Sequence, residues 1–310
     1  MARKILSSAD LLQAPSDLDL LNKLEENLTR AASAFIDEVV MRAFEIKGLS
    51  FDCSLSNQLA RASIVDEATY KILFGRSLTS ATLNLATLVA PQAREILDIF
   101  DEKEIIEFTF NYISWLILLH EVAHITHGHL EYIQEKGMAG YIEISTERVP
   151  LVHLHEEPEE SQHFWRALES EADAYAISAS LPTFYYINNA EQWKTLMTDT
   201  VIRYHGMMAS LTFHMMHVLA NGYQDFRHPP ATIRLGISLA SIESLAKSYG
   251  WSVDKTITLI IEGHYEMAAV VLAQEVDVHG PLESARYMST LDATIKRASF
   301  ENFRVKARVR

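Results

Sequence analysis

Apolar residues recur at helical spacing along most of the chain. In the segment 17–47 they follow every three or four positions up to Gly48, a typical C-terminal cap, so one long amphipathic helix is predicted there. The segment 108–125 is apolar almost all round, which indicates a buried helix, and we expect it to run on to about Lys136. Further helices are predicted at 161–182, 191–221, 231–249, 254–275 and 282–298.

One part of the chain has a pattern typical of strands. Residues 70–75 and 82–89 are rich in apolar and β-branched side chains on either side of a Gly-Arg-Ser turn, so a small sheet is predicted. Pro91 is expected to restart the chain with a short helix. The predicted fold class is therefore mainly α, a helical bundle around the segment 108–125 with a small β-sheet. No repeat or linker divides the sequence, so we expect a single domain over 1–310 with an N-terminal helical extension over 1–50.

The buried helix carries an H-E-x-x-H motif at its C-terminal end. His120 and His124 are one turn apart and project from the same face, where two neutral imidazoles can hold one tetrahedral ion. Zinc suits imidazole nitrogens best. Glu121 lies about 100° further round the helix, where its carboxylate can act as general base toward a metal-activated water. Without a metal, burying these three polar side chains would cost several kcal/mol.

A third ligand is expected C-terminal to the motif. The metzincin continuation would place Gly at 127 and His at 130, but these positions are His127 and Leu130, so that class is excluded. Glu169 and Asp173 share one face of the predicted helix 161–182. One of them can bind zinc while the other accepts a hydrogen bond from a ligand histidine.

Three motifs together carry a family resemblance. They are H-E-x-x-H-x-x-x-x-H over 120–129, E-x-x-A-D over 169–173, and H-P-P over 228–230 followed by Arg234. Their order resembles the gluzincin metallopeptidases of the HtpX and CAAX-prenyl-protease types, with an α+β zincin-like fold. The string from His120 to Leu130 is also similar to soluble Lit-type phage-exclusion proteases and IrrE-like proteases. The HtpX and CAAX types are usually embedded in or tethered to membranes, and outside the motifs this chain does not look like them.

The resemblance implies a role for each motif residue. The implied function is a zinc-dependent endopeptidase with one zinc ion per chain and a protein or peptide as substrate. Arg234 and Tyr204 are further candidates for stabilising the oxyanion, Tyr204 only because it is available. The implied site residues are the ligands His120, His124 and Glu169, the general base Glu121, the supporting residues Asp173 and His129, and His228 near the reaction centre.

A second function remains open at this stage. His127 follows His124 by three positions, and a fourth protein ligand there would close the metal site. The protein would then be a metal-stapled regulatory or interaction protein without peptidase activity.

Composition narrows the partners and the compartment. The chain has 27 basic and 41 acidic residues and a net charge of −14, which argues against nucleic acid as a partner. Cys53 is the only cysteine, which favours a reducing compartment. The N-terminus has no apolar core typical of a secretory signal, and the polar motif residues would be expensive in lipid. We therefore expect a soluble, cytoplasmic protein without stable membrane insertion, acting on a specific intracellular protein.

Overall fold

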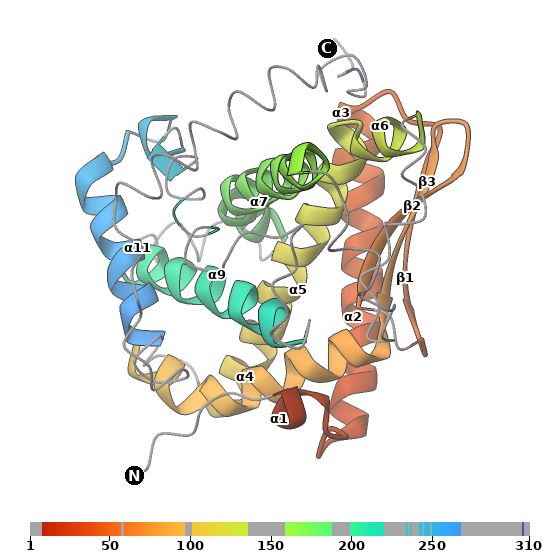
Figure 1. Ribbon diagram of the computed structural model, residues 1–310. Coiled ribbons are helices and arrows are strands. Elements are labelled where there is room, and N and C mark those ends of the chain that lie inside the picture. The colour runs from red at the N-terminus through yellow and green to blue at the C-terminus, as the bar shows by residue number, and fades with distance from the viewer. Residues whose placement is uncertain are drawn as a thin grey trace.

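The fold is mainly helical and includes one small sheet (Figure 1). The computed structural model describes residues 8–56, 59–96, 101–135, 159–187, 199–219 and 250–267, and from the rest 234, 236, 242–243, 245–248 and 306. Helix α5 (Glu102–Thr126) lies in the middle of the molecule, with α2 and the sheet on one side and α7 and α9 on the other (Figure 1). The prediction of a mainly α fold with a small sheet is confirmed.

Helix α5 owes its position to its own sequence. Asp101 and Glu104 form a capping box at its start, in which each side chain accepts a hydrogen bond from the other's backbone N–H. Of the helices described, only α5 is long and apolar enough to cross a membrane, but 72% of its most apolar window is buried inside the protein. Here the apolar surface of α5 packs against other elements of the fold, as in a core helix.

The predicted helix over 17–47 is divided and ends early. Helix α2 (Leu18–Phe35) begins at Asp17, whose side chain accepts a hydrogen bond from the Leu20 N–H. A π-helical turn η1 (Ile36–Val40) and the short α3 (Met41–Ala43) continue it. Phe44 then adopts an extended conformation, so the helix stops before the predicted Gly48 cap.

The sheet contains three strands in the order β1-β3-β2. Strand β1 (Gly48–Ser54) pairs in parallel with β3 (Thr69–Gly75), and β2 (Ala60–Asp66) pairs with β3 in an antiparallel hairpin. The predicted strand at 70–75 is therefore confirmed. Phe51, Ala62, Ile72 and Phe74 are buried in the hydrophobic core that α2 and α5 also line.

The second predicted strand, 82–89, is wrong, because this segment belongs to α4 (Arg76–Ile96). Its apolar residues are buried at helical spacing, and the hydroxyls of Thr82 and Thr87 donate to the carbonyls of Leu78 and Leu83 at 2.9 Å. The threonines are thus satisfied within the helix in spite of their preference for strands. Pro91 does not restart the chain either, since it lies inside α4 on the exposed side.

The remaining helices follow the predicted pattern with shifted ends. Helix α7 (Glu159–Ile187) packs along α5, and α9 (Asp199–Leu219) packs against α11 (Val253–Met267). Gly206 and Gly263 allow a close crossing of α9 and α11, because a Cβ at either position would collide with the other helix's backbone. The predicted helix 231–249 is described only in part, and 282–298 lies outside the described residues.

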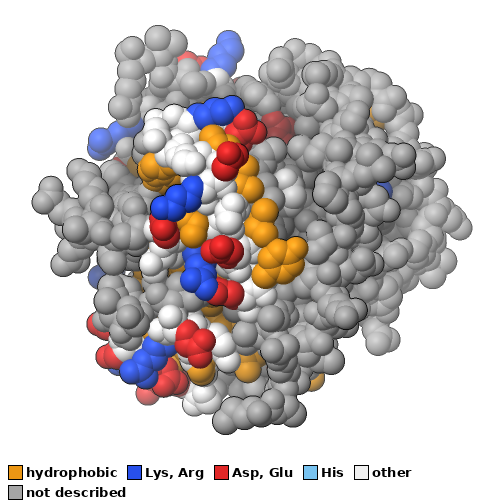
Figure 2. Space-filling model, turned by 90° about the vertical axis from the view of Figure 1, so that its left-hand side faces the viewer, with side chains coloured by type: hydrophobic (Ala, Val, Ile, Leu, Met, Phe, Trp, Pro, Cys, Tyr) orange, Lys and Arg blue, Asp and Glu red, His pale blue; other side chains and the backbone are white. Residues whose placement is uncertain are grey.

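The side of the molecule formed by α11 carries charges of both signs. Figure 2 shows basic and acidic side chains interspersed on this face rather than gathered by sign. Ion pairs join α9 to α11 on this side. Lys255 Nζ lies 2.7 Å from Asp199 Oδ1, and Arg203 Nε lies 2.8 Å from Glu266 Oε2. These pairs are exposed and contribute little to stability.

Candidate metal centre

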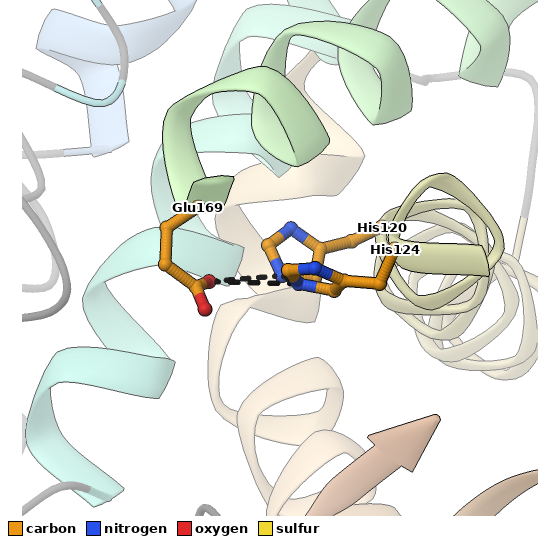
Figure 3. Close-up of side chains that lie close together, drawn as sticks. All are labelled: His120, His124 and Glu169. Carbon is orange, nitrogen blue, oxygen red and sulfur yellow. Dashed lines mark hydrogen bonds and ion pairs between the residues drawn. The ribbon is translucent and has the colours of Figure 1, made fainter. Parts of the chain in front are cut away.

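The last two turns of α5 present His120 and His124 toward the same space. The two rings lie edge to face with their centroids 4.7 Å apart, and their Nε2 atoms are 3.0 Å apart (Figure 3). Both residues are largely buried, and so is Glu121 between them in sequence. The helix places them there because it continues unbroken from the capping box at Asp101 to Thr126.

Helix α7 brings Glu169 to the two histidines. Glu169 Oε2 lies 3.2 Å from His120 Nε2 and 3.8 Å from His124 Nε2, and Figure 3 shows the carboxylate facing both rings. We call His120, His124 and Glu169 the first cluster. The sequence left Glu169 and Asp173 as candidates for the third ligand. Glu169 is the one whose carboxylate lies next to the Nε2 atoms of both histidines.

Asp173 lies behind His120, one helical turn after Glu169. Its Oδ1 is 3.0 Å from His120 Nδ1, and Arg234 donates to both carboxylate oxygens at 2.6 Å through Nε and Nη2. The guanidinium also lies over the Phe213 ring, 4.5 Å from its centroid. Burial alone would raise the pKa of Asp173, but Arg234 and the hydrogen bond from His120 hold it below its usual range. Asp173 is therefore ionised and accepts the hydrogen of His120 Nδ1.

His120 lies where a positive charge is favoured. Burial lowers the pKa of its imidazole, but the hydrogen bonds and charges of Asp173 and Glu169 outweigh burial and raise that pKa to about 10. The two carboxylates thus attract a cation to the Nε2 side of the ring. A proton or a metal ion can supply that charge.

His124 has a different partner behind it. Its Nδ1 is 2.9 Å from His129 Nδ1, and His129 Nε2 is 3.2 Å from Glu171 Oε2. Burial lowers the pKa of His129 to about 4, so this ring is neutral. The Glu171 carboxylate can only accept, so His129 donates from Nε2 and accepts at Nδ1. His124 must then donate from its own Nδ1, which leaves its Nε2 without a hydrogen.

The outer hydrogen bonds therefore turn three acceptors toward one point. Donation from Nδ1 turns the Nε2 atoms of His120 and His124 toward the Glu169 carboxylate, and a metal ion bound there would replace the proton on His120 Nε2. Three atoms bound to a tetrahedral zinc ion at about 2.0–2.1 Å lie about 3.3–3.4 Å from one another. The observed separations of 3.0, 3.2 and 3.8 Å bracket this value. The first cluster fits a zinc-sized cation in charge, donor set and dimensions.

A small cavity lies on the open side of His120. Its volume of about 30 Å³ is enough for one or two water molecules. Glu121, Asp173, Thr212 and Arg234 line the cavity beside His120, and the rest of its wall is apolar. Among the lining residues are Leu116, Ile117, Ile177, Phe213 and Met216.

Other candidate residues are placed elsewhere or fall outside the described residues. Tyr204 is a buried residue of α9, and its hydroxyl is 2.8 Å from that of Thr109, which lies three turns before His120 on α5, so Tyr204 does not reach the cavity. Arg234 is buried and committed to Asp173 rather than placed on the surface. His228 lies outside the described residues.

His127 does not join the first cluster. The helix predicted to run to Lys136 breaks at His127 and Gly128, where Gly128 has a φ of 74°, and α6 (His129–Glu135) begins after the turn. His127 is thereby directed to His129 and Glu171, with which it forms the second cluster. Among the described residues the first cluster thus offers three potential metal ligands. The sequence reasoning missed Glu171, although it lies in the same segment as Glu169 and would have been found by seeking an acceptor for His129.

Comparison with known proteins gives one match. Residues 91–253 match the sequence model of the family described as Peptidase U49, a range that covers more than half of the chain and contains both clusters. Of the families that the motifs resemble, this match supports the Lit-type proteases. No curated protein and no solved structure matches the chain.

Proposed function

Because the chain belongs to the Peptidase U49 family, we propose that it is a zinc-dependent endopeptidase with its metal centre at the first cluster. The observation that carries the proposal is the convergence of two imidazole Nε2 atoms and one carboxylate on a single point. Two histidines, one glutamate and an open position are the ligand set of a catalytic zinc site. Asp173 and His129 orient the two rings, as residues behind metal ligands commonly do.

The reaction follows from the residues around the cavity. When bound at the first cluster, zinc lowers the pKa of water and polarises the scissile carbonyl. Glu121 takes a proton from the attacking water as the bond between its oxygen and the carbonyl carbon forms. Glu121 then passes this proton to the leaving nitrogen as the peptide C–N bond breaks. The apolar walls of the cavity exclude other water and strengthen these electrostatic interactions.

The metal-stapled alternative loses its main support. It requires a fourth protein ligand, and the residue proposed for this role, His127, belongs to the second cluster. A buried glutamate at a water-sized cavity beside the ligands is, in addition, a feature that a purely structural site does not need.

We further propose an intracellular protein as the substrate. A peptidase acts on a protein or peptide, and the single cysteine of the chain suits a reducing compartment. The acidic net charge of −14 makes nucleic acid an unfavourable partner.

Glu121→Gln tests the proposal. We expect this variant to keep about one zinc per chain and to lose hydrolysis, because the amide cannot accept the proton from water. Glu107→Gln is the matched control, since it makes the same change on the same helix away from the cavity. Each protein is incubated with an extract of intracellular proteins, and new N-termini are identified by mass spectrometry.

The outcomes separate the metal centre from the catalytic role. New N-termini produced by the wild type and by Glu107→Gln, but not by Glu121→Gln, support the mechanism. Equal cleavage by Glu121→Gln contradicts the role of Glu121. Zinc that remains bound with unchanged affinity in the double variant Glu169→Gln, His127→Ala, which lacks a ligand of each cluster, contradicts the metal centre itself.

A further inference from the structure

The second cluster stands directly behind the first. It consists of His127, His129 and Glu171, whose potential ligand atoms all lie within 4.8 Å of one another. Glu171 Oε2 is 3.2 Å from His129 Nε2, and Glu171 Oε1 is 4.0 Å from His127 Nδ1. Two imidazoles and a carboxylate are the same donor set as in the first cluster, at slightly wider spacing.

The turn between α5 and α6 builds this cluster. His127 is the C-cap of α5, and the positive φ of Gly128 reverses the chain so that His129 opens α6 beside it. Helix α7 supplies Glu171 from the other side. The His127 and Glu171 side chains are 20% and 14% exposed, whereas His129 is fully buried. The cluster therefore lies at the edge of the core, with two of its three side chains partly exposed.

We propose that the second cluster is a regulatory site for a divalent cation of the zinc class, and that its occupation opposes occupation of the first cluster. The proposal rests on the proposed function in taking the first cluster as the catalytic zinc site. The two clusters are connected through a single contact, the 2.9 Å separation of His124 Nδ1 and His129 Nδ1.

Only one hydrogen fits between these two nitrogens. A metal ion at His124 Nε2 requires the hydrogen of this ring to be on Nδ1, where it points at His129. A metal ion at His129 Nε2 likewise requires a hydrogen on His129 Nδ1, pointing at His124. With both ions bound, two donors would face each other in a buried gap, and one of them would have no acceptor.

Exchange between the two states balances in protons. When an ion leaves His124 and another binds His129, His129 Nε2 loses its hydrogen and His124 Nε2 gains one. The hydrogen between the rings moves from His124 to His129. Within the His124–His129 pair the number of hydrogens is unchanged, so the opposition between the clusters comes from the hydrogen that the two rings share. A buried donor left without an acceptor weakens the second binding event by about tenfold or more, and the effect is reciprocal.

Zinc binding to four forms of the full-length protein tests the proposal. Affinities for the first and second equivalents are measured by competition with a coloured chelator, and stoichiometry by elemental analysis. Glu169→Gln removes the carboxylate of the first cluster and His127→Ala removes a ligand of the second, while both leave the His124–His129 contact intact. The double variant lacks both sites, and Glu171→Gln repeats the second-cluster test with the hydrogen-bond acceptor retained.

We expect Glu169→Gln to bind one zinc at the second cluster at least about tenfold more tightly than the wild type binds its second equivalent. His127→Ala and Glu171→Gln should keep the first equivalent and lose or weaken the second. The proposal of a second site is contradicted if His127→Ala binds the second zinc equivalent as tightly as the wild type, or if Glu169→Gln binds no zinc. Equal affinities for the second cluster in the wild type and Glu169→Gln overturn the opposition. If the first cluster is not the catalytic zinc site, the result is different: His127→Ala would then lose the zinc equivalent that binds most tightly.

Discussion

Replacing Asp173 by asparagine removes the charge on which both Arg234 and His120 depend. Asp173 is 1% exposed and accepts three hydrogen bonds, two from Arg234 at 2.6 Å and one from His120 at 3.0 Å. Asparagine has one acceptor oxygen and one NH₂ group, so at least one donor would face another donor. The buried guanidinium would also lose its counter-charge. Breaking a buried ion pair from one side costs about 3–5 kcal/mol of the free energy of unfolding.

The same substitution should weaken zinc binding. A neutral amide supports the His120 ring less well than a carboxylate, and loss of such a supporting residue typically lowers metal affinity about 10- to 100-fold. This factor corresponds to about 1.4–2.7 kcal/mol. Denaturant unfolding with and without a chelator separates the two costs, because the loss of affinity contributes only when zinc is present.

Asp199→Asn is the control for this experiment. It makes the identical change in an exposed ion pair, in which the Asp199 side chain is 58% exposed and 2.7 Å from Lys255, so about 0–1 kcal/mol is expected. The reasoning is refuted if, with zinc removed by a chelator, Asp173→Asn is as stable as Asp199→Asn, and if Asp173→Asn also binds zinc as tightly as the wild type.

Two further predictions concern proton release and the turn after α5. Zinc must displace the proton that a pKa of about 10 keeps on His120, so zinc affinity should rise about tenfold per pH unit between pH 7 and 9. In zinc-free protein, protonated His120 stabilises the fold fully below its unfolded pKa of 6.5. This contribution is lost as the pH rises toward about 10. Calorimetry in buffers of different ionisation enthalpy measures the proton release, and a pH-independent affinity would contradict the assignment. Gly128→Ala and Gly250→Ala both place alanine at positive φ, 74° and 69°, and each should cost about 1 kcal/mol in thermal unfolding. Only Gly128→Ala should also weaken zinc binding, through His129, and equal zinc affinities in the two variants would show that the turn does not orient this residue.

The parts of the site that the sequence predicted are those that a single helix fixes. The spacing of His120 and His124 determines that they share a face, and the same i, i+4 rule puts Glu169 and Asp173 on one face of α7. The apolar run before the motif correctly indicated that α5 is buried. What spacing cannot determine is the approach of α7 to α5, which decides that Glu169 meets the Nε2 atoms while Asp173 meets Nδ1.

The failures arose where local preference and tertiary packing disagree. The threonines of 82–89 favour strands, but burial against α5 at helical spacing outweighs this preference in α4. The turn at Gly128 was missed because the apolar pattern continues through it into α6. This turn separates His127 from the first cluster, so the position of a helix end decided between the three-ligand site and the closed site that the sequence left open.

The two histidines of the first cluster are supported in chemically different ways. His120 donates to an ionised aspartate that is neutralised by arginine, a fixed arrangement that takes no further proton near neutral pH. His124 donates to a neutral histidine, whose acceptor nitrogen persists only while His129 keeps its own hydrogen on the side of Glu171. A carboxylate accepts in any arrangement, whereas an imidazole can change from acceptor to donor. The proposed metal centre is therefore fixed on its His120 side and adjustable on its His124 side, and a ligand that binds His129 Nε2 should act on the first cluster through His124 alone.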